Sequence, residues 1–209
     1  MPEPLVELRE ATVELGGRKV LDRFSLAAEA GELVAITGPN GSGKSTLLRT
    51  LSGEWGVGDL RLGGKDVRTM AAGELSRRRA WLEQQPGCAW PLTAAEVVAL
   101  GGTDVGGALA QVGATPLHDR RITELSGGER RLVHVARCLA QLGVPKGKVL
   151  LLDEPDAGLD ADHRVRINAA LRGFAAAGGA VIVATHAEEL AEACGRRVGM
   201  GKGGMGGGA

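Results

Sequence analysis

A glycine-rich segment near the N-terminus has the residue types and the spacing of a phosphate-binding loop. Residues 38–45 read Gly-Pro-Asn-Gly-Ser-Gly-Lys-Ser and match G-x-x-x-x-G-K-[ST] at every fixed position. Glycines let backbone N–H groups approach phosphate oxygens closely, and the N-terminus of the following helix adds partial positive charge. Lys44 is expected to reach the β- and γ-phosphates of a nucleotide, and the Ser45 hydroxyl to hold Mg²⁺. The alternative is a chance match among 34 glycines. A predicted strand before the loop and a helix after it argue against chance.

Two adjacent carboxylates follow the apolar run Val149–Leu152. Asp153 is expected to bind Mg²⁺ through water, because Mg²⁺ keeps much of its hydration. Glu154 is one residue further out, where it could polarise a water aimed at the γ-phosphate. Alone, an Asp-Glu-Pro sequence more often marks a turn after a strand. Together with the glycine-rich loop, it favours a nucleotide-hydrolysing site.

A third segment precedes a helix that is expected to begin near Arg130, and it consists of Leu125, Ser126, Gly127, Gly128 and Glu129. Its serine and glutamate have the spacing of a capping box, which is the ordinary structural interpretation. The functional interpretation uses the same geometry, because a glycine-flanked helix N-terminus can bind an anion. The segment alone does not distinguish the two.

Three apolar runs predict strands covered on both faces, namely Leu33–Thr37, Val149–Leu152 and Ala180–Thr185. Helical stretches alternate with them and predict an α/β fold with a mainly parallel sheet; they include Lys44–Ser52, Leu132–Leu142 and Val165–Ala177. In such sheets ligands bind at the carboxyl ends of the strands. The three strands end at the glycine-rich loop, at the carboxylate pair and at His186. These groups are therefore expected to converge.

The remaining segments predict three additions to this sheet. Leu5–Val13 and Val20–Ala28 alternate apolar and polar residues around a Gly-Gly pair, which predicts an antiparallel hairpin. Residues 86–145 show no convincing buried strand and predict an inserted helical subdomain. The glycine-rich tail, residues 199–209, is expected to be mobile, with a weak terminal hairpin as the alternative.

The composition argues against several classes of protein. With 25 basic and 25 acidic side chains the formal net charge is zero, so nucleic acid is not expected as a partner. The N-terminus does not have the pattern of a signal peptide, and no apolar run approaches the ~20 residues that cross a bilayer. Cys88, Cys138 and Cys194 lie far apart. They predict free, buried or partly buried thiols in a reducing compartment, rather than disulfides or a zinc site.

Taken in order, these motifs resemble those of ATP-binding cassette (ABC) ATPases. The resemblance runs from about residue 5 to 198 and is carried by GPNGSGKST, Gln84, LSGGE, LLLDEP, Leu159-Asp160 and His186. It implies a single domain over residues 1–209 with an α/β, P-loop NTPase (RecA-like) fold. That fold has a mainly parallel sheet, an N-terminal antiparallel β subdomain and an inserted helical subdomain. The nucleotide-binding core would cover residues 1–85 and 146–198, and the helical signature subdomain residues 86–145.

The resemblance also implies which residues bind the nucleotide and the metal. The nucleotide is ATP, bound by Gly38, Pro39, Asn40, Gly41, Ser42, Gly43, Lys44, Ser45, Thr46 and Gln84. The metal is Mg²⁺, with ligands at Ser45, Gln84 and Asp153. The segment 125–129 is the family's signature, which completes the ATP site of a second copy in an ATP-dependent, head-to-tail homodimer.

Two catalytic residues are implied by the resemblance. Glu154 would be the general base and His186 would contact the γ-phosphate, while Asp160 would bridge the dimer. Considered alone, Gln84 could be a surface glutamine, with Gln85 as a rival for the functional position. The segment around His186, residues 185–188, also has the spacing of a capping box.

By this resemblance the chain would be the ATP-hydrolysing subunit of a transporter, peripheral on the cytoplasmic side of the cell membrane. Its partners would be transmembrane permease subunits and a substrate-binding protein. Segments 47–54, 77–85, 93–101 and 135–142 are similar to importer ATPases for haem, iron chelates and cobalamin, with haem the first choice and cobalamin the second. The alternatives are transport of another substrate, a low-turnover regulatory nucleotide-binding module, and a soluble ABC protein of DNA repair or translation.

Two features depart from the family's pattern. Leu15 occupies the place where an aromatic residue usually stacks on adenine, which predicts roughly ten- to a hundredfold weaker ATP binding and relaxed base selectivity. Glycines replace the family's final strands. The arginine clusters are expected to be solvated faces, with docking to a membrane partner as the alternative; they comprise Arg77–Arg79, Arg120, Arg121, Arg130 and Arg131.

Overall fold

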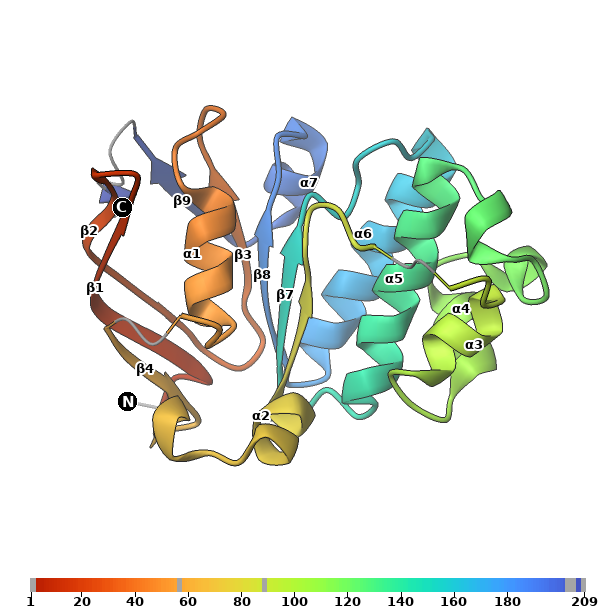
Figure 1. The fold of residues 1–209 in the computed structure, drawn as a ribbon, viewed down its shortest axis with the longest axis horizontal. Helices are drawn as coiled ribbons and strands as arrows, with labels where there is room; N and C mark the ends of the chain where they lie inside the picture. Colours follow the sequence, from red (N-terminus) through yellow and green to blue (C-terminus); the bar gives the residue numbers. More distant parts are fainter. Residues whose placement is uncertain (1–2, 56–57, 88–89, 202–205, 208–209) are drawn as a thin grey trace.

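The computed structural model describes residues 3–55, 58–87, 90–201 and 206–207, and the structural statements concern these residues. Figure 1 shows antiparallel strands on one side, a parallel sheet in the middle and a group of helices on the other side. In chain order the elements are β1 (Val6–Leu15), β2 (Arg18–Ala28), β3 (Leu33–Thr37), α1 (Lys44–Leu51), β4 (Asp59–Leu62), β5 (Lys65–Asp66), η1 (Val67–Thr69), α2 (Ala72–Arg78), β6 (Arg79–Leu82), α3 (Ala94–Ala99), α4 (Val105–Gln111), η2 (Thr115–Leu117), η3 (Ile122–Glu124), α5 (Gly127–Leu142), β7 (Val149–Asp153), α6 (Ala161–Ala176), β8 (Ala180–Ala184), α7 (Glu188–Ala193), β9 (Arg196–Met200) and β10 (Gly206–Gly207).

The central sheet has six described strands in the order β10-β9-β3-β8-β7-β6. β3 pairs in parallel with β9 and β8, and β7 pairs in parallel with β8 and β6. The strand β10 is antiparallel to β9. The three strands expected from apolar runs are present as β3, β7 and β8, with bounds that agree within a residue. The prediction of a mainly parallel sheet is confirmed.

A second, antiparallel sheet has the order β2-β1-β4-β5 and contains the expected N-terminal hairpin. The pairing runs from Val6 opposite Ala28 to Leu15 opposite Arg18, so the turn falls at the Gly-Gly pair. Helix α1 contacts β1 and β2 on one side and β7 and β8 on the other (Figure 1). The helix that follows the glycine-rich loop is thereby held between the two sheets.

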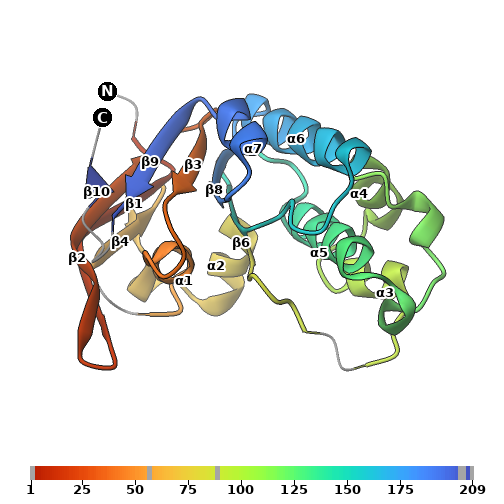
Figure 2. The ribbon, with the colours of Figure 1, turned by 90° about the horizontal axis from the view of Figure 1, so that it is seen from above.

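Two hydrophobic cores lie on opposite faces of the parallel sheet, which explains why its central strands are apolar throughout. Leu150 and Leu152 of β7 pack in the core that includes the helices from α3 to α7. Val149 and Leu151 pack in the other core, with α1 and the antiparallel sheet. Successive strand residues point to opposite faces, so a strand between two cores is apolar at every position. In Figure 2, α6 and α7 lie on one side of this sheet and α1 lies on the other.

The long helix α5 begins at Gly127, ahead of the start that the sequence predicts near Arg130, because Ser126 caps it. The Ser126 hydroxyl accepts the Glu129 amide at 3.2 Å, and the Glu129 carboxylate accepts the Ser126 amide at 2.7 Å. The structural interpretation of this segment as a capping box is therefore confirmed. Helix α5 packs against α3 and α4 on the one hand and against β6 on the other, so it connects the helical part of the chain to the sheet.

Two strands of the parallel sheet, β6 and β9, were not expected from the sequence. β6 begins with Arg79 and β9 begins with Arg196 and Arg197, and in both strands residues are more buried only at alternate positions. The expectation of a mobile tail is wrong where the tail is described. Gly206 and Gly207 pair with Met200 and Gly199, which forms the terminal hairpin that was the alternative. Residues 202–205 and 208–209 of the tail lie outside the described part.

The described cysteines are free thiols, as expected. Cys138 is buried and Cys194 is partly buried, whereas Cys88 lies outside the described residues. Burial raises the pKa of the Cys194 thiol to about 11 and also raises the pKa of Cys138. Neither thiol is therefore activated as a nucleophile. No helix in the described ranges is long and apolar enough to cross a bilayer.

The buried His134 of α5 predicts that this fold is sensitive to acid. Both ring nitrogens lack a hydrogen-bond partner among the residues that the structure describes. Burial and, to a lesser extent, nearby arginine charges lower the pKa of His134 to about 4. The unfolded chain takes up this proton below about pH 6.5, so stability falls as the pH drops from there towards the folded pKa. We expect this residue to remove up to about 1.4 kcal/mol of unfolding free energy per pH unit in that window. Urea titrations at several pH values measure the unfolding free energy as a function of pH. That free energy should depend less steeply on pH in His134→Leu than in the parent chain, and an equal pH dependence would contradict the assignment.

Candidate nucleotide-binding site

The carboxyl ends of β3, β8 and β7, which are neighbours in the sheet, meet at one cleft of about 660 Å³. β3 leads into the glycine-rich loop, β7 leads to Glu154, and β8 leads to His186. The convergence that the sequence predicts is therefore present, and Gln84 joins it whereas Gln85 does not line the cleft. The lining residues are Leu15, Val20, Asn40, Gly41, Gly43, Lys44, Ser45, Thr46, Gln84, Glu154 and His186.

The glycine-rich loop turns tightly into α1, with Gly43 as the N-cap of the helix. Its φ of 101° lies in the region that favours glycine, and a Cβ atom there would come within 2.9 Å of the Val20 side chain. Another residue would therefore push the loop away from β2. The first N–H groups of any helix have no intrahelical acceptor, so this end of α1 can donate to a phosphate.

Lys44 is a buried cation, and within the described ranges no anion is hydrogen-bonded or ion-paired to it. The side chain is 6% exposed, and its ammonium donates to the carbonyls of Gly38 at 2.9 Å and Pro39 at 3.1 Å. Burial lowers the pKa of Lys44, and the Glu154 and Asp153 carboxylates act in the opposite direction. Hydrogen bonds between charged groups are about twice as strong as neutral ones. A phosphate in the cleft would thus be a better partner than the loop carbonyls.

Asp153 and Ser45 have the donor chemistry of a magnesium site. Asp153 is buried, and its Oδ2 atom has no hydrogen-bond partner in the described part of the chain. Burial raises its pKa against the opposing effect of a hydrogen bond with Ser45. Mg²⁺ prefers oxygen ligands and commonly shares them with substrate phosphates. Within the described ranges, no group of three or more His, Cys, Asp or Glu residues could hold a metal alone. The residues present therefore fit a cation shared with a nucleotide.

Glu154 and His186 lie side by side in the cleft, with His186 Nε2 at 3.3 Å from Glu154 Oε1. The φ of Glu154 is 49°, a left-handed conformation that costs about 1–3 kcal/mol for a non-glycine residue. The Glu154 amide donates to the Ala184 carbonyl of β8 at 2.8 Å, so the sheet holds this turn. The strained turn leaves a carboxylate beside an imidazole, a pair that can accept and donate protons.

A buried pair that was not expected from the sequence, Asp156 and Thr185, supports this turn. The Thr185 hydroxyl donates to the Asp156 carboxylate at 3.2 and 3.3 Å and accepts the Ala187 amide at 3.0 Å. Burial raises the pKa of Asp156. Helix α7 begins at Glu188 with Ala187 as its N-cap, so the alternative of a capping box around His186 is wrong. His186 is instead held between two hydrogen-bonded neighbours.

The signature segment lies outside the residues that line the cleft. Ser126 and Gly127 are exposed at the start of α5, and Glu129 completes the cap. A Cβ atom on Gly128 would lie 2.5 Å from the Gly158 carbonyl oxygen, so this glycine permits close packing against the segment after β7. The capping box therefore coexists with a solvent-facing helix N-terminus.

Leu125 and Asp160 have structural roles within the single chain. Leu125 is buried in the core shared with the helices. The Asp160 carboxylate caps α6: it accepts the His163 amide at 2.9 Å and lies 2.8 Å from His163 Nδ1. The backbone hydrogen bond, and then the bond with the histidine ring, lower the pKa of Asp160. Its side chain is 65% exposed and so remains accessible to a second copy.

Arg131 corrects the expectation that the arginine clusters are solvated faces. It is half-buried, and its guanidinium donates to the Asp153 carbonyl at 3.2 Å and the Gln84 carbonyl at 2.6 Å. Arg79 is also largely removed from solvent, and burial lowers its pKa. The expectation is wrong for these two residues, whereas Arg130 is exposed as expected. Sequence alone gave no signal, because adjacent arginines on a helix usually face water.

Comparison with known proteins identifies the family. The family model described as ABC transporter matches residues 21–157. The chain belongs to the ABC transporter family. The resemblance seen in the sequence motifs is thereby confirmed, and with it a nucleotide-binding, ATP-hydrolysing cassette.

Relatives and solved structures agree with this assignment. The chain is 41% identical to the hemin import ATP-binding protein HmuV of Rhodopseudomonas palustris (strain BisA53), over 89% of this chain and 74% of the relative. It is 39% identical to HmuV of Bradyrhizobium diazoefficiens, over 90% and 75%. The dimeric, post-hydrolysis structure of the ATP-binding cassette MJ0796 with ADP and Pi superimposes with a TM-score of 0.83, at 26% identity and 95% coverage of both chains. The predicted cassette fold is confirmed.

The position of Leu15 in the cleft makes the ATP affinity of this cassette testable by substitution. The side chain is 46% exposed and lines the cleft beside the glycine-rich loop together with Val20. Stacking of a base on an aromatic side chain is worth about 1–3 kcal/mol, so Leu15→Trp should tighten ATP binding by roughly tenfold. Equilibrium titration with a ribose-labelled fluorescent ATP measures this change. Leu100→Trp, at an exposed leucine that does not line the cleft, is the control, and an equal gain in both variants would contradict the role of Leu15.

Proposed function

We propose that this chain is the ATP-hydrolysing subunit of an importer for haem. Proteins that carry the name hemin import ATP-binding protein are similar to it along most of its length. The observation that carries hydrolysis is the convergence of Lys44, Gln84, Glu154 and His186 in one cleft. Fold alone would not support a reaction, because function depends on the geometry of the site.

In the proposed binding step, the phosphates of the nucleotide neutralise charge that is poorly compensated in the folded chain alone. Lys44 exchanges its loop carbonyls for phosphate oxygens, and the glycine-rich loop and the N-terminus of α1 supply further donors. Ser45, Gln84 and Asp153 would hold Mg²⁺, which supplies charge neutralisation at the phosphates when bound. The unpartnered Asp153 oxygen supports this donor set.

In the proposed hydrolytic step Glu154 accepts a proton from the attacking water. Its carboxylate is partly exposed at the cleft, where water has access, and His186 lies 3.3 Å away. We assign His186 the hydrogen bond to the γ-phosphate, which orients the reacting group beside the base. The water oxygen bonds to the γ-phosphorus as the bond between the β–γ bridging oxygen and the γ-phosphorus breaks. ADP and inorganic phosphate leave, and the proton on Glu154 passes to solvent water.

The proposed active unit is a head-to-tail dimer. The exposed N-terminus of α5, with Ser126 and Gly127, does not line its own cleft and is therefore available to a second copy. Such a helix end can donate to the γ-phosphate of an ATP held by the partner copy. One structural neighbour at 26% identity is a dimeric cassette with ADP and Pi, which supports this arrangement. Asp160 would then lie where it can bridge the two copies.

The proposed setting is the cytoplasmic face of a membrane, where the chain binds transmembrane permease subunits. The importer names of the relatives support a permease, and a substrate-binding protein would deliver the cargo to it. Described helices too short or too polar to cross a bilayer fit a peripheral subunit. No nucleic-acid partner is proposed, since the formal net charge is zero.

Replacement of the proposed general base is the direct test of hydrolysis. We expect Glu154→Gln to lower ATP turnover by at least about a hundredfold, because a positioned base contributes about 10²–10⁴-fold. Nucleotide affinity should be retained. Steady-state phosphate release and a fluorescent-nucleotide titration measure the two quantities. Glu189→Gln, at an exposed carboxylate paired with Arg164, is the matched control. Turnover that is absent in the parent, or equal in both variants, would support a low-turnover regulatory module instead.

The cargo is tested in the assembled transporter. The chain would be co-purified with its permease in lipid nanodiscs, and ATP turnover would be measured with a haem-loaded binding protein, a cobalamin-loaded one and neither. Stimulation by haem alone supports the proposal. If the cobalamin-loaded protein stimulates ATP turnover instead, or if neither loaded protein does, the cargo is not haem.

A further inference from the structure

Helix α5 carries a row of polar side chains that bond to backbone carbonyls along the outer edge of the parallel sheet. β6 is the last strand of this sheet and pairs with β7 on its inner side. Gln141 donates to the carbonyls of Ser76 and Arg79, at 2.9 and 3.1 Å. Arg137 donates to the Trp81 carbonyl at 3.4 Å. The Arg79 and Trp81 carbonyls belong to β6, so Gln141 and Arg137 occupy acceptors that a further strand could otherwise use, whereas Ser76 lies in α2.

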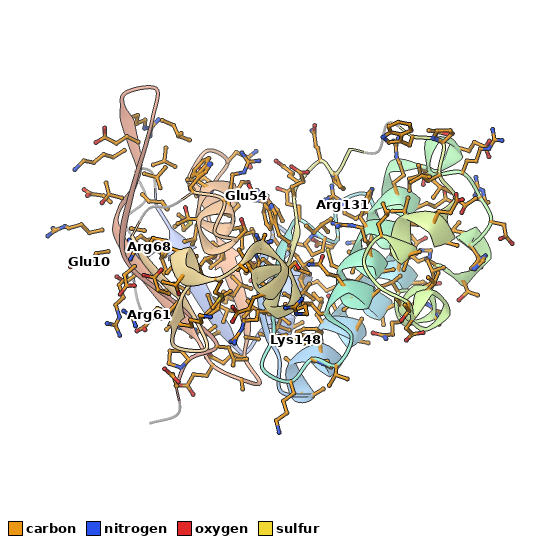
Figure 3. All side chains as sticks on the ribbon, turned by 60° about the horizontal axis from the view of Figure 1, so that its bottom comes forward. Glu10, Glu54, Arg61, Arg68, Arg131 and Lys148 are labelled. Atoms are coloured by element: carbon orange, nitrogen blue, oxygen red, sulfur yellow. The ribbon has the colours of Figure 1, made fainter. Side chains whose placement is uncertain are left out.

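Arg131 ends this row and differs from the others because it reaches two elements of the nucleotide site. Its guanidinium donates to the Gln84 carbonyl, directly after β6, and to the Asp153 carbonyl, at the end of β7. Burial lowers its pKa, while the carboxylates of Glu154, Asp153 and Asp156 act in the opposite direction. Figure 3 shows Arg131 on the side of α5 that faces the sheet. The Arg131 guanidinium thus links Gln84 and Asp153, two of the residues that we assign as Mg²⁺ ligands.

We propose that Arg131 is a positioning residue that sets the separation of Gln84 and Asp153 and thereby the affinity of the site for Mg²⁺. The inference rests on the proposed function, because it needs a magnesium-nucleotide complex in the cleft. The planar guanidinium can donate to both carbonyls at once in a fixed geometry. An ammonium group on a flexible stem lacks this fixed geometry. Since Ser126 starts the same helix, the contact also ties the signature segment to the metal site.

Two other arginines of α5 serve as controls that distinguish a positioning role of Arg131 from a merely structural one. Arg137 joins the same helix to the same strand further from the cleft, so its loss weakens packing without touching either carbonyl next to the site. Arg130 is an exposed arginine next to Arg131 and controls for the loss of positive charge. Removal of groups that support metal ligands typically costs about 10–100-fold in metal affinity.

The experiment is a Mg²⁺ titration of nucleotide binding with a fluorescent ADP analogue, which does not require turnover. We expect Arg131→Met to raise the Mg²⁺ concentration for half-saturation by about tenfold and to change the affinity for magnesium-free ADP by less than about twofold. Arg131→Lys should fall between wild type and Arg131→Met. Arg137→Met and Arg130→Met should keep the wild-type half-saturation, even where Arg137→Met lowers the melting temperature.

Three results would overturn the inference, and they are distinguishable. If Arg131→Met has the wild-type half-saturation, or Arg137→Met shifts it equally, Arg131 has no special positioning role and the proposed function stands. If the wild-type chain binds ADP with no response to Mg²⁺, the metal site is wrong. If the wild-type chain binds no nucleotide, the proposed function fails and the inference fails with it.

Discussion

The buried ammonium of Lys44, hydrogen-bonded to two carbonyls of its own loop, is the interaction on which the rest of the site depends. Asp153, whose charge acts on Lys44, is also a group that burial disfavours as an ion, since burial raises its pKa. A buried charge has a stability cost that hydrogen bonds reduce and that a counter-charge reduces further. A nucleotide polyphosphate with its cation supplies both signs of charge at once. We therefore expect nucleotide binding to be favoured, because it relieves a cost that the fold of the chain itself imposes.

The parallel sheet makes this concentration of charge possible. The strands β3, β8 and β7 are apolar on both faces, so they are fixed by two cores and deliver their polar ends to one edge. The same cores hold the strained backbone at Glu154, whose amide bonds to β8. The signature end of α5 is anchored by Leu125 but left open to solvent. One chain thus holds a binding cleft and, at a separate place, the solvent-facing helix end that we propose completes the cleft of another copy.

The sequence predicted the central strands, the loop and the cleft because their signals are local. A run such as Leu33–Thr37 is apolar whichever way the chain folds, and the loop motif has fixed spacing. The strand β6 was missed because it is short and begins with Arg79, directly after the two arginines that end α2. Arg131 was misjudged because its acceptors are carbonyls distant in sequence. The Asp156–Thr185 hydrogen bond joins two loops and has no spacing that a single sequence could reveal. The sequence therefore could not predict contacts of side chains with backbone or side-chain groups that are distant along the chain.

The most direct test of this account is the molar mass of the Glu154→Gln chain, measured by light scattering after gel filtration with magnesium and ATP, with magnesium and ADP, and without nucleotide. The account predicts a dimer with ATP and a monomer in the other two conditions, because only the γ-phosphate offers the second copy's helix end a partner. It also predicts that Ser126→Arg prevents the dimer while ATP remains bound. A chain that binds ATP but stays monomeric at every concentration would contradict the central claim that each site is completed by a second copy.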